Sequence, residues 1–372
     1  MKPGILIYAI GSSEWIGGVY YARNVAYQLS TNQTIMNRFD IYVYTNEECK
    51  CNFETIPKIK IITAKRTNKI DLFFNILKYH IKYRFPAIKN IELIGCKAIS
   101  WIPDFQQECL SDMFSAEEID ARRKERREII ENNLPLILSS NDSLNSFHKY
   151  YNFKKKNEYV MHFVSYIEPE ICAMSAEAES ITLKKYDLKG KKYVYIANQF
   201  WKHKNHIIVL EAINYLNNIF STKLIFVFTG KMSDYRNPEY IEDLKKVFYP
   251  LEKEGIAINL GFVERMEQLI IMKNAEFLIQ PSLFEGWGTV LEDAKVLDKT
   301  VLLSDIPVHM EQKNDKCILF DPNNAKNLAN LIHNEELKYH FSDANAGVER
   351  MKVEAYKYSK EFQRLLQEDG GY

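Results

Sequence analysis

The sequence contains no apolar run close to the roughly 20 residues that a membrane-spanning helix needs, which argues against a transmembrane protein. It also has no excess of charge of either sign. The 49 Lys and Arg residues balance the 49 Asp and Glu residues, so no overall electrostatic field attracts nucleic acid or membranes. We therefore expect no nucleic-acid partner. The apolar run in the opening segment MKPGILIYAIGSSEWIGG is too short for a signal peptide and is interpreted as a first strand.

Cysteine is scarce as well. The six cysteines are scattered, a distribution that favours reduced thiols and a cytoplasmic location. Cys49 and Cys51 lie close together, but no second Cys or His pair follows at the spacing of a zinc site. We therefore predict no metal site there.

The sequence is rich in short apolar runs that alternate with helical patterns. With 46% apolar residues over 372 positions, a globular protein of two domains is expected. The alternation predicts parallel sheets covered on both faces by helices, such as those expected over 18–30 and 115–133. The expected strands are 5–10, 40–45, 98–102, 134–140, 192–198, 223–230, 257–262, 275–282, 299–305 and 316–322.

A polar stretch near 168–190 interrupts this alternation. We therefore predict an α/β fold with doubly wound domains at 1–167 and 191–354, joined by a linker at 168–190, and a C-terminal helix at 355–372 that returns to the first domain. In such folds ligands bind beyond the carboxyl ends of the strands, so the loops after the strands are the candidate sites.

Two loops of the first domain carry candidate residues. Gly17 and Gly18 precede a helix, where they either let a ligand approach the backbone or supply a turn with positive φ. Asp104 follows strand 98–102 beside Trp101 and Phe105. Its carboxylate either acts on a hydroxyl or forms an Asx-turn, and the local sequence favours the turn.

The loop ANQFWKHKNH after strand 192–198 gathers Lys202, His203, Lys204 and His206 where a helix begins. Cations beside free helix N–H groups suit a diphosphate. A run of charges is more often a solvated surface. Here, however, the run interrupts an apolar strand–helix unit, which favours phosphate binding.

The segment PSLFEGWGTVLED (281–293) joins strand 275–282 to a helix. Thr289 and Glu292 have the spacing of a capping box, which gives Glu292 a structural explanation. The capping box explains neither Glu285 nor the glycines around Trp287. For these residues the alternative to an ordinary strand-to-helix turn is a loop that lets phosphate or sugar approach the backbone.

In combination these segments resemble the family-4 glycosyltransferases, which have the two-domain GT-B fold. PSLFEGWGTVLEDAK is similar to the family's P-S-x-x-E-G-F-G motif and its following helix, with Trp287 as the aromatic residue. LDKTVLLSDIPVHMEQ and CILFDPNNAKNLANLI are similar to the strand–helix units that follow. The resemblance spans most of 190–340 and is weaker over 1–165. It implies two Rossmann-like domains that face a central cleft.

The resemblance implies a role for each residue of the motif. Glu285 contacts the donor sugar, and the second acidic residue, Asp293 or its neighbour Glu292, holds the ribose. The turn and helix start receive the diphosphate through the backbone N–H groups of Gly286, Trp287, Gly288 and Thr289.

The resemblance also places the base and the diphosphate clamp. Val263 lies in the segment that contacts the base. Lys204 matches the family's Lys, whereas Gln199 occupies the position of its Arg, so Lys202 or the two histidines are hypothesised to compensate. Asp104 lies in a loop where many relatives carry a His-Asp pair, and here Pro103 precedes it.

The implied reaction is transfer of a sugar from a nucleoside-diphosphate donor to a hydroxyl, with retention and without a metal or other cofactor. The expected acceptor is a saccharide or a lipid-linked acceptor, in surface polysaccharide or O-antigen-type biosynthesis. A nucleotide-sugar epimerase and a non-catalytic nucleotide-binding subunit are the alternatives.

The basic and apolar stretch 65–85 suggests one further partner. As a helix it either rests on an anionic membrane surface or packs on the first domain, and packing is the more common outcome for such helices.

Overall fold

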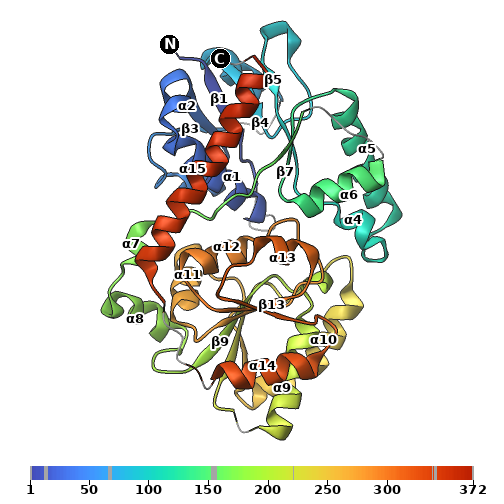
Figure 1. Cartoon of the computed structure of the whole chain (residues 1–372), viewed down its shortest axis with the longest axis vertical. Coiled ribbons are helices and arrows are strands. Elements are labelled where there is room, and N and C mark those ends of the chain that lie inside the picture. The colour runs from blue at the N-terminus through green and yellow to red at the C-terminus, as the bar shows by residue number, and fades with distance from the viewer. Residues whose placement is uncertain are drawn as a thin grey trace. The chain divides into compact units, whose positions relative to one another are not determined.

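The computed structural model describes residues 2–11, 16–65, 69–151, 157–220, 222–336, 338 and 342–370. The chain divides into two compact units (Figure 1). The first comprises Met1–Ser111, Ala116–Tyr166 and Arg350–Tyr372, and the second comprises Asp112–Ser115 and Ile167–Glu349.

The first unit contains two parallel sheets. One has the order β3-β2-β1-β4-β5 and the other β6-β7-β8. Only Ile99 separates β5 from β6, so one short run of chain belongs to both sheets. The strands are β1 (Gly4–Tyr8), β2 (Asp40–Thr45), β3 (Lys60–Thr63), β4 (Ile81–Phe85), β5 (Lys97–Ala98), β6 (Ser100–Ile102), β7 (Leu136–Leu138) and β8 (Glu158–Val160).

Helices connect these strands, as parallel pairing requires. They are α1 (Ile16–Thr31), α2 (Gln33–Arg38), η2 (Glu47–Phe53), α3 (Lys69–Lys78), η3 (Glu92–Ile94), α4 (Gln106–Cys109), η4 (Ser111–Met113), α5 (Ala116–Glu131) and α6 (Asn141–Tyr151).

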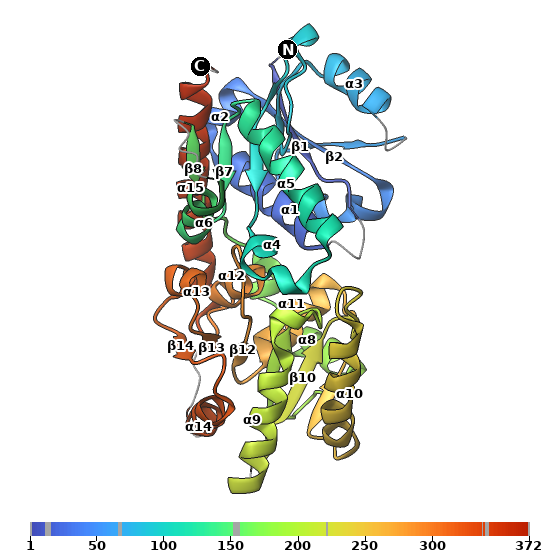
Figure 2. The ribbon, with the colours of Figure 1, turned by 90° about the vertical axis from the view of Figure 1, so that its right-hand side faces the viewer.

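The last helix, α15 (Ala344–Glu368), enters the first unit at Arg350 and runs beside α1 and α2 (Figures 1 and 2). Its buried face carries Tyr358, whose hydroxyl lies 3.4 Å from that of Tyr21. Beyond its end, Asp369 pairs with Lys97 at 2.9 Å. These contacts hold the C-terminal segment on the first unit.

The second unit contains one six-stranded parallel sheet of order β11-β10-β9-β12-β13-β14, the strand order of a doubly wound Rossmann-like fold. The order reverses between β9 and β12, and ligands bind at such a switch point. The strands are β9 (Tyr193–Ala197), β10 (Ile225–Thr229), β11 (Ala257–Asn259), β12 (Leu278–Gln280), β13 (Val301–Ser304) and β14 (Cys317–Phe320).

Alternation along β9 shows how both faces of this sheet are covered. Val194 and Ile196 belong to the core beneath α9, α10 and α14, whereas the hydroxyl of Tyr193 reaches the carbonyl oxygen of Ile271 in α11 at 2.7 Å. The helices are α7 (Pro169–Cys172), α8 (Ala176–Lys185), η5 (Lys202–Lys204), α9 (His206–Ile219), α10 (Pro238–Lys253), α11 (Arg265–Asn274), α12 (Thr289–Val296), α13 (Pro307–Gln312) and α14 (Ala325–Glu336).

Two sequence-based expectations for the fold were wrong. Residues 168–190 do not form a plain linker, because they contain α7 and α8 and belong to the second unit, where Glu179 pairs with Lys273 of α11 at 2.6 Å. A helix over 65–85 is present only at Lys69–Lys78 among the described residues, since 66–68 lie outside them and 81–85 form β4, an interior strand of the sheet. Charged residues that alternate along β4 hid its strand character.

No helix among the described residues is both long and apolar enough to cross a membrane.

Gly230, directly after β10, has a φ of +129°, and a Cβ there would lie 2.4 Å from the carbonyl oxygen of Asn198. We therefore expect Gly230→Ala to lower the urea midpoint of unfolding more than Gly255→Ala. Gly255 has a φ of +73° with no atom within 4 Å of its Cβ position, so its substitution costs only the backbone strain, about 1 kcal/mol. Equal midpoints for the two variants would contradict the close approach.

Candidate active site

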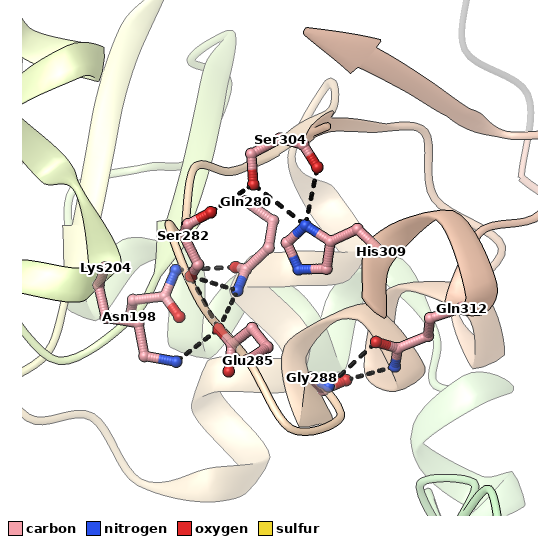
Figure 3. A network of polar contacts seen from close by, with 9 residues as sticks. All are labelled: Asn198, Lys204, Gln280, Ser282, Glu285, Gly288, Ser304, His309 and Gln312. Carbon is pink, nitrogen blue, oxygen red and sulfur yellow. Dashed lines mark hydrogen bonds and ion pairs between the residues drawn. The ribbon is translucent and has the colours of Figure 1, made fainter. Parts of the chain in front are cut away.

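The candidate site lies at the switch point of the second unit. Lys204 follows β9 in η5, and Glu285 lies between β12 and α12. Although 81 positions separate them, Lys204 Nζ lies 2.6 Å from Glu285 Oε1 because β9 and β12 are adjacent (Figure 3). The two side chains are only 19% and 11% exposed, so water screens this ion pair weakly.

Three donors converge on one oxygen of Glu285. Besides Lys204, Oε1 accepts from Gln280 Nε2 at 2.9 Å and from Ser282 Oγ at 2.7 Å. Asn198 orients the Gln280 amide by donating to its Oε1 at 2.8 Å. Oε2 receives no hydrogen bond from any described residue, which leaves it available to a ligand (Figure 3).

The charge of Glu285 follows from these contacts. Burial by itself raises the pKa of this carboxyl, but the charge and hydrogen bond of Lys204 outweigh burial and lower the pKa to about 2. Glu285 is therefore an anion at neutral pH and cannot act as a proton donor there. Its chemistry is that of a hydrogen-bond acceptor and a stabiliser of positive charge.

The turn before α12 is fixed by a side chain from another helix. Gln312 of α13 accepts from Gly288 N at 3.0 Å through Oε1 and donates to Gly288 O at 2.8 Å through Nε2. The N–H of Gly288, one of those expected to receive a diphosphate, is thus already engaged.

The capping box expected for α12 was wrong. The helix begins at Thr289 with Gly288 as its N-cap and no side-chain cap bond. Glu292 instead accepts from Gln312 Nε2 at 2.9 Å and Lys295 Nζ at 2.8 Å. The buried Gln312, distant in sequence, offers Glu292 a partner that local spacing does not reveal.

The two residues considered for the ribose are both buried. Asp293 receives a two-point contact from Arg265, with N–O distances of 2.6 and 2.5 Å. Glu292 belongs to the network around Gln312, where burial raises the pKa of its carboxyl. That one of the two binds ribose stays a prediction.

The loop after β9 departs from the expected charge pattern. The side chain of Gln199, at the family's Arg position, accepts from the backbone N–H of Lys231 at 2.8 Å. Burial and the nearby charge of Lys204 lower the pKa of both His203 and His206 to about 3. Both rings are therefore neutral at pH 7, so these histidines do not supply the missing charge, and only Lys202 remains of the three residues proposed to compensate.

The remaining sequence-predicted residues lie on other loops, with Gly17, Gly18 and Asp104 in the first unit. Gly17 and Gly18 lie inside the first turn of α1 without positive φ, so the alternative of a turn with positive φ does not hold, and the approach of a ligand to their backbone stays a prediction. Asp104 Oδ1 accepts from Gln106 N at 3.0 Å, as the Asx-turn interpretation predicts. Val263 lies in the loop before α11 and is 7% exposed.

Several polar residues of the site escaped the sequence analysis. Ser282 stands within the quoted motif, but Gln280 and His309 carry no local signal of their own, and neither does Gln312. They became recognisable only once the strand order brought β12, β13 and α13 together. The cluster as a whole offers a cation, a fixed anion and a helix start within one loop system (Figure 3).

Comparison with known protein families decides what kind of domain carries this cluster. Residues 180–343 match the family model described as "Glycosyl transferases group 1". This segment is a group 1 glycosyltransferase domain. Lys204, Glu285 and Asp293 all lie within the matched residues. None of the curated proteins matches the sequence significantly.

Solved structures place the whole chain with GT-B glycosyltransferases in fold. Anabaena HepE in complex with UDP-glucose is 14% identical, with a TM-score of 0.65 over 99% of this chain and 100% of that chain. An α,α-trehalose-phosphate synthase from Burkholderia xenovorans, in complex with glucose-6-phosphate, is 11% identical, with a TM-score of 0.66 over 98% and 100%. WaaG, a glycosyltransferase involved in lipopolysaccharide biosynthesis, is 10% identical, with a TM-score of 0.61 over 97% and 98%.

The ion pair of the glycosyltransferase domain predicts a pH-dependent stability. The pKa of Glu285 is about 2, below its ordinary 4.5, so the anion stabilises the folded domain above pH 4.5, and this contribution is lost as the pH falls towards 2. In Lys204→Met the buried carboxylate has lost its cation. We expect this variant to be less stable than the wild type at pH 7, and the difference to shrink at pH 3.5, as measured by urea unfolding.

The matched control is Lys246→Met, because Lys246 pairs with Asp243 at 2.7 Å with both side chains more than 70% exposed. Its effect should be small at either pH. A loss in Lys204→Met that is the same at pH 7 and pH 3.5 would count against the assigned role of the pair.

Proposed function

We propose that the protein transfers a sugar from a nucleoside-diphosphate donor to a hydroxyl of a saccharide or lipid-linked acceptor, with retention at the anomeric carbon. The observation that carries this proposal is the buried Lys204–Glu285 pair at the switch point of a group 1 glycosyltransferase domain. A cation for a leaving diphosphate and a carboxylate for the sugar stand side by side there.

The donor's parts are assigned to the residues that suit them. Lys204 binds the diphosphate together with the start of α12, where the N–H of Gly288 itself is held by Gln312. Glu285 Oε2 accepts from sugar hydroxyls. Donor binding then moves Lys204 from the carboxylate to the phosphate.

The chemistry follows from these charges. Departure of a diphosphate leaves a sugar with oxocarbenium character, so the transition state develops negative charge at the phosphate and positive charge at the sugar. Lys204 and the start of α12 stabilise the first, and ionised Glu285 stabilises the second. We propose neither a covalent nucleophile nor a cofactor. Asp104 is assigned to the acceptor hydroxyl as a base.

The ligands and roles of the similar proteins support the proposed donor and acceptor. HepE binds UDP-glucose, and the trehalose-phosphate synthase binds glucose-6-phosphate, which supports a UDP-sugar donor and a saccharide acceptor here. The participation of WaaG in lipopolysaccharide biosynthesis supports a role in surface polysaccharide assembly.

A panel of UDP-, GDP- and dTDP-sugars tests the reaction. We expect slow release of a free nucleoside diphosphate from one donor, whereas an epimerase changes the sugar with the diphosphate intact and a non-catalytic subunit only binds. Lys204→Ala removes a charged hydrogen bond to phosphate and should weaken nucleotide-sugar binding on the order of 10- to 100-fold by calorimetry. Lys246→Ala is the control. Unchanged affinity in Lys204→Ala would refute the assigned clamp.

Helix α3 supports contact with a membrane that carries a lipid-linked acceptor. Ile70, Phe74 and Leu77 are 67%, 64% and 44% exposed and fall on one face at helical spacing, with Lys69 and Lys78 at the two ends. The buried Ile76 packs on the first unit, so the helix is anchored as well as exposed. Figure 2 shows α3 on the opposite side of the first unit from α15. We propose an anionic membrane surface as the partner of the exposed face.

Flotation with vesicles that contain phosphatidylglycerol tests this contact. The triple variant Ile70→Ser, Phe74→Ser, Leu77→Ser should lose retention on these vesicles, and neutral vesicles should retain the wild type less. The control variant replaces Ile181 and Ile219, exposed by 74% and 55% in the second unit, with Ser. A wild type that never floats would sink the proposal.

A further inference from the structure

His309 is a fully buried histidine of α13 that no sequence motif assigned to the site. Its neighbours determine which nitrogen carries the proton. Ser304 Oγ lies 2.6 Å from the carbonyl oxygen of Ser282 and donates its proton there. His309 Nδ1 lies 2.9 Å from the carbonyl oxygen of Ser304 and 3.0 Å from Ser304 Oγ. Because a carbonyl oxygen only accepts, Nδ1 must be the protonated nitrogen.

The other ring nitrogen, Nε2, therefore carries a lone pair. It is buried and has no hydrogen-bond partner among the described residues. Burial lowers the pKa of the ring, which keeps it neutral at pH 7 and preserves this lone pair. An unsatisfied buried acceptor is costly and calls for a functional explanation.

Nε2 faces the side of the site that contains Glu285 and the start of α12 (Figure 3). Figure 3 shows it on the side of the ring turned towards Glu285 and Gly288, away from Ser304. Glu285 is close enough for its charge to act on the ring. The side of the cluster next to the start of α12 thus presents two acceptors, Glu285 Oε2 and His309 Nε2, that receive no hydrogen bond from the part of the chain that the structure describes.

We propose that His309 Nε2 accepts a hydrogen bond from a hydroxyl of the transferred sugar and makes the enzyme select donors that carry that hydroxyl. This inference rests on the proposed function and names a specificity residue for it. Because His309 has no exposed surface, the proposal requires that the hydroxyl gain access to Nε2 when Lys204 moves to the diphosphate and separates from Glu285.

Selectivity follows from the chemistry of the acceptor. The unprotonated nitrogen of a neutral imidazole cannot donate, so a sugar whose hydroxyl is replaced by hydrogen or fluorine leaves Nε2 buried without a partner. Sites built to bind a hydroxyl reject analogues that lack it far more strongly than apolar pockets do. Glu285 alone would hold hydroxyls by charge and discriminate less between neighbouring positions.

His309→Asn is the decisive variant. The amide of Asn can donate to Ser304 from the position of Nδ1, but it provides no acceptor at the position of Nε2. The experiment uses the nucleotide sugar that the wild type cleaves, its free nucleoside diphosphate, and the deoxyfluoro analogue at each hydroxyl of the sugar. kcat/KM is measured for each donor, and affinity for the nucleoside diphosphate is measured by calorimetry.

We expect His309→Asn to lower kcat/KM for the natural donor roughly tenfold while the affinity for the nucleoside diphosphate is unchanged. One deoxyfluoro donor should be poor for the wild type and no poorer for the variant. Equal losses for donor and nucleoside diphosphate would assign His309 a purely structural role and overturn the proposal, as would unchanged kinetics. A wild type that cleaves no nucleotide sugar refutes the proposed function instead.

Discussion

The buried ion pair between Lys204 and Glu285 is the contact on which the site depends. Taking both charges out of water is costly, and the cost is recovered only when further hydrogen bonds satisfy the carboxylate. Gln280 and Ser282 supply these bonds, and Asn198 fixes the Gln280 amide in turn. The pair exists only because β9 and β12 are neighbours in the sheet. Strand order therefore determines the electrostatics of the site.

A second set of contacts comes from α13, whose two buried polar side chains act on different parts of the loop system. Gln312 bridges the N–H and the carbonyl of Gly288, which fixes the start of α12. His309 is tied to Ser304 through Nδ1, and this bond determines which nitrogen keeps a lone pair. One helix of six residues thus sets both the geometry of the turn before α12 and the tautomer of its own buried imidazole.

Burial and the charge of Lys204 together decide the charge states of His203, His206 and Glu285. His203 and His206 remain neutral, because desolvation and the Lys204 cation both oppose protonation. Glu285 stays ionised against the same desolvation, because its cation is in direct contact. The region thus carries a lysine cation and a carboxylate anion in contact, and a ligand with both a diphosphate and hydroxyl groups can engage each of them.

The order of strands and helices in the second unit was largely predictable from the sequence, because parallel strands that are buried on both faces have nearly continuous apolar sequences. The residues by themselves marked the two loops as candidate sites, and the resemblance to the family's motifs then singled out Lys204 and Glu285. The short strands β3 and β8 and the charged strand β4 were missed, because their hydrophobic pattern is weak. The capping box predicted at Glu292 was also wrong. Local spacing cannot show that Gln312, from another helix, provides the hydrogen-bond partner of Glu292.

The sequence by itself therefore determined the fold class and the two residues at the centre of the site. Only the tertiary structure decided what those residues contact and in which charge state they stand. Hydrogen bonds from Gln312 to Glu292 and from Ser304 to Ser282 join segments that are distant in the chain, and the pKa of Glu285 depends on a lysine 81 positions away. Periodicity and spacing report neighbours along the chain, whereas burial and charge depend on neighbours in space.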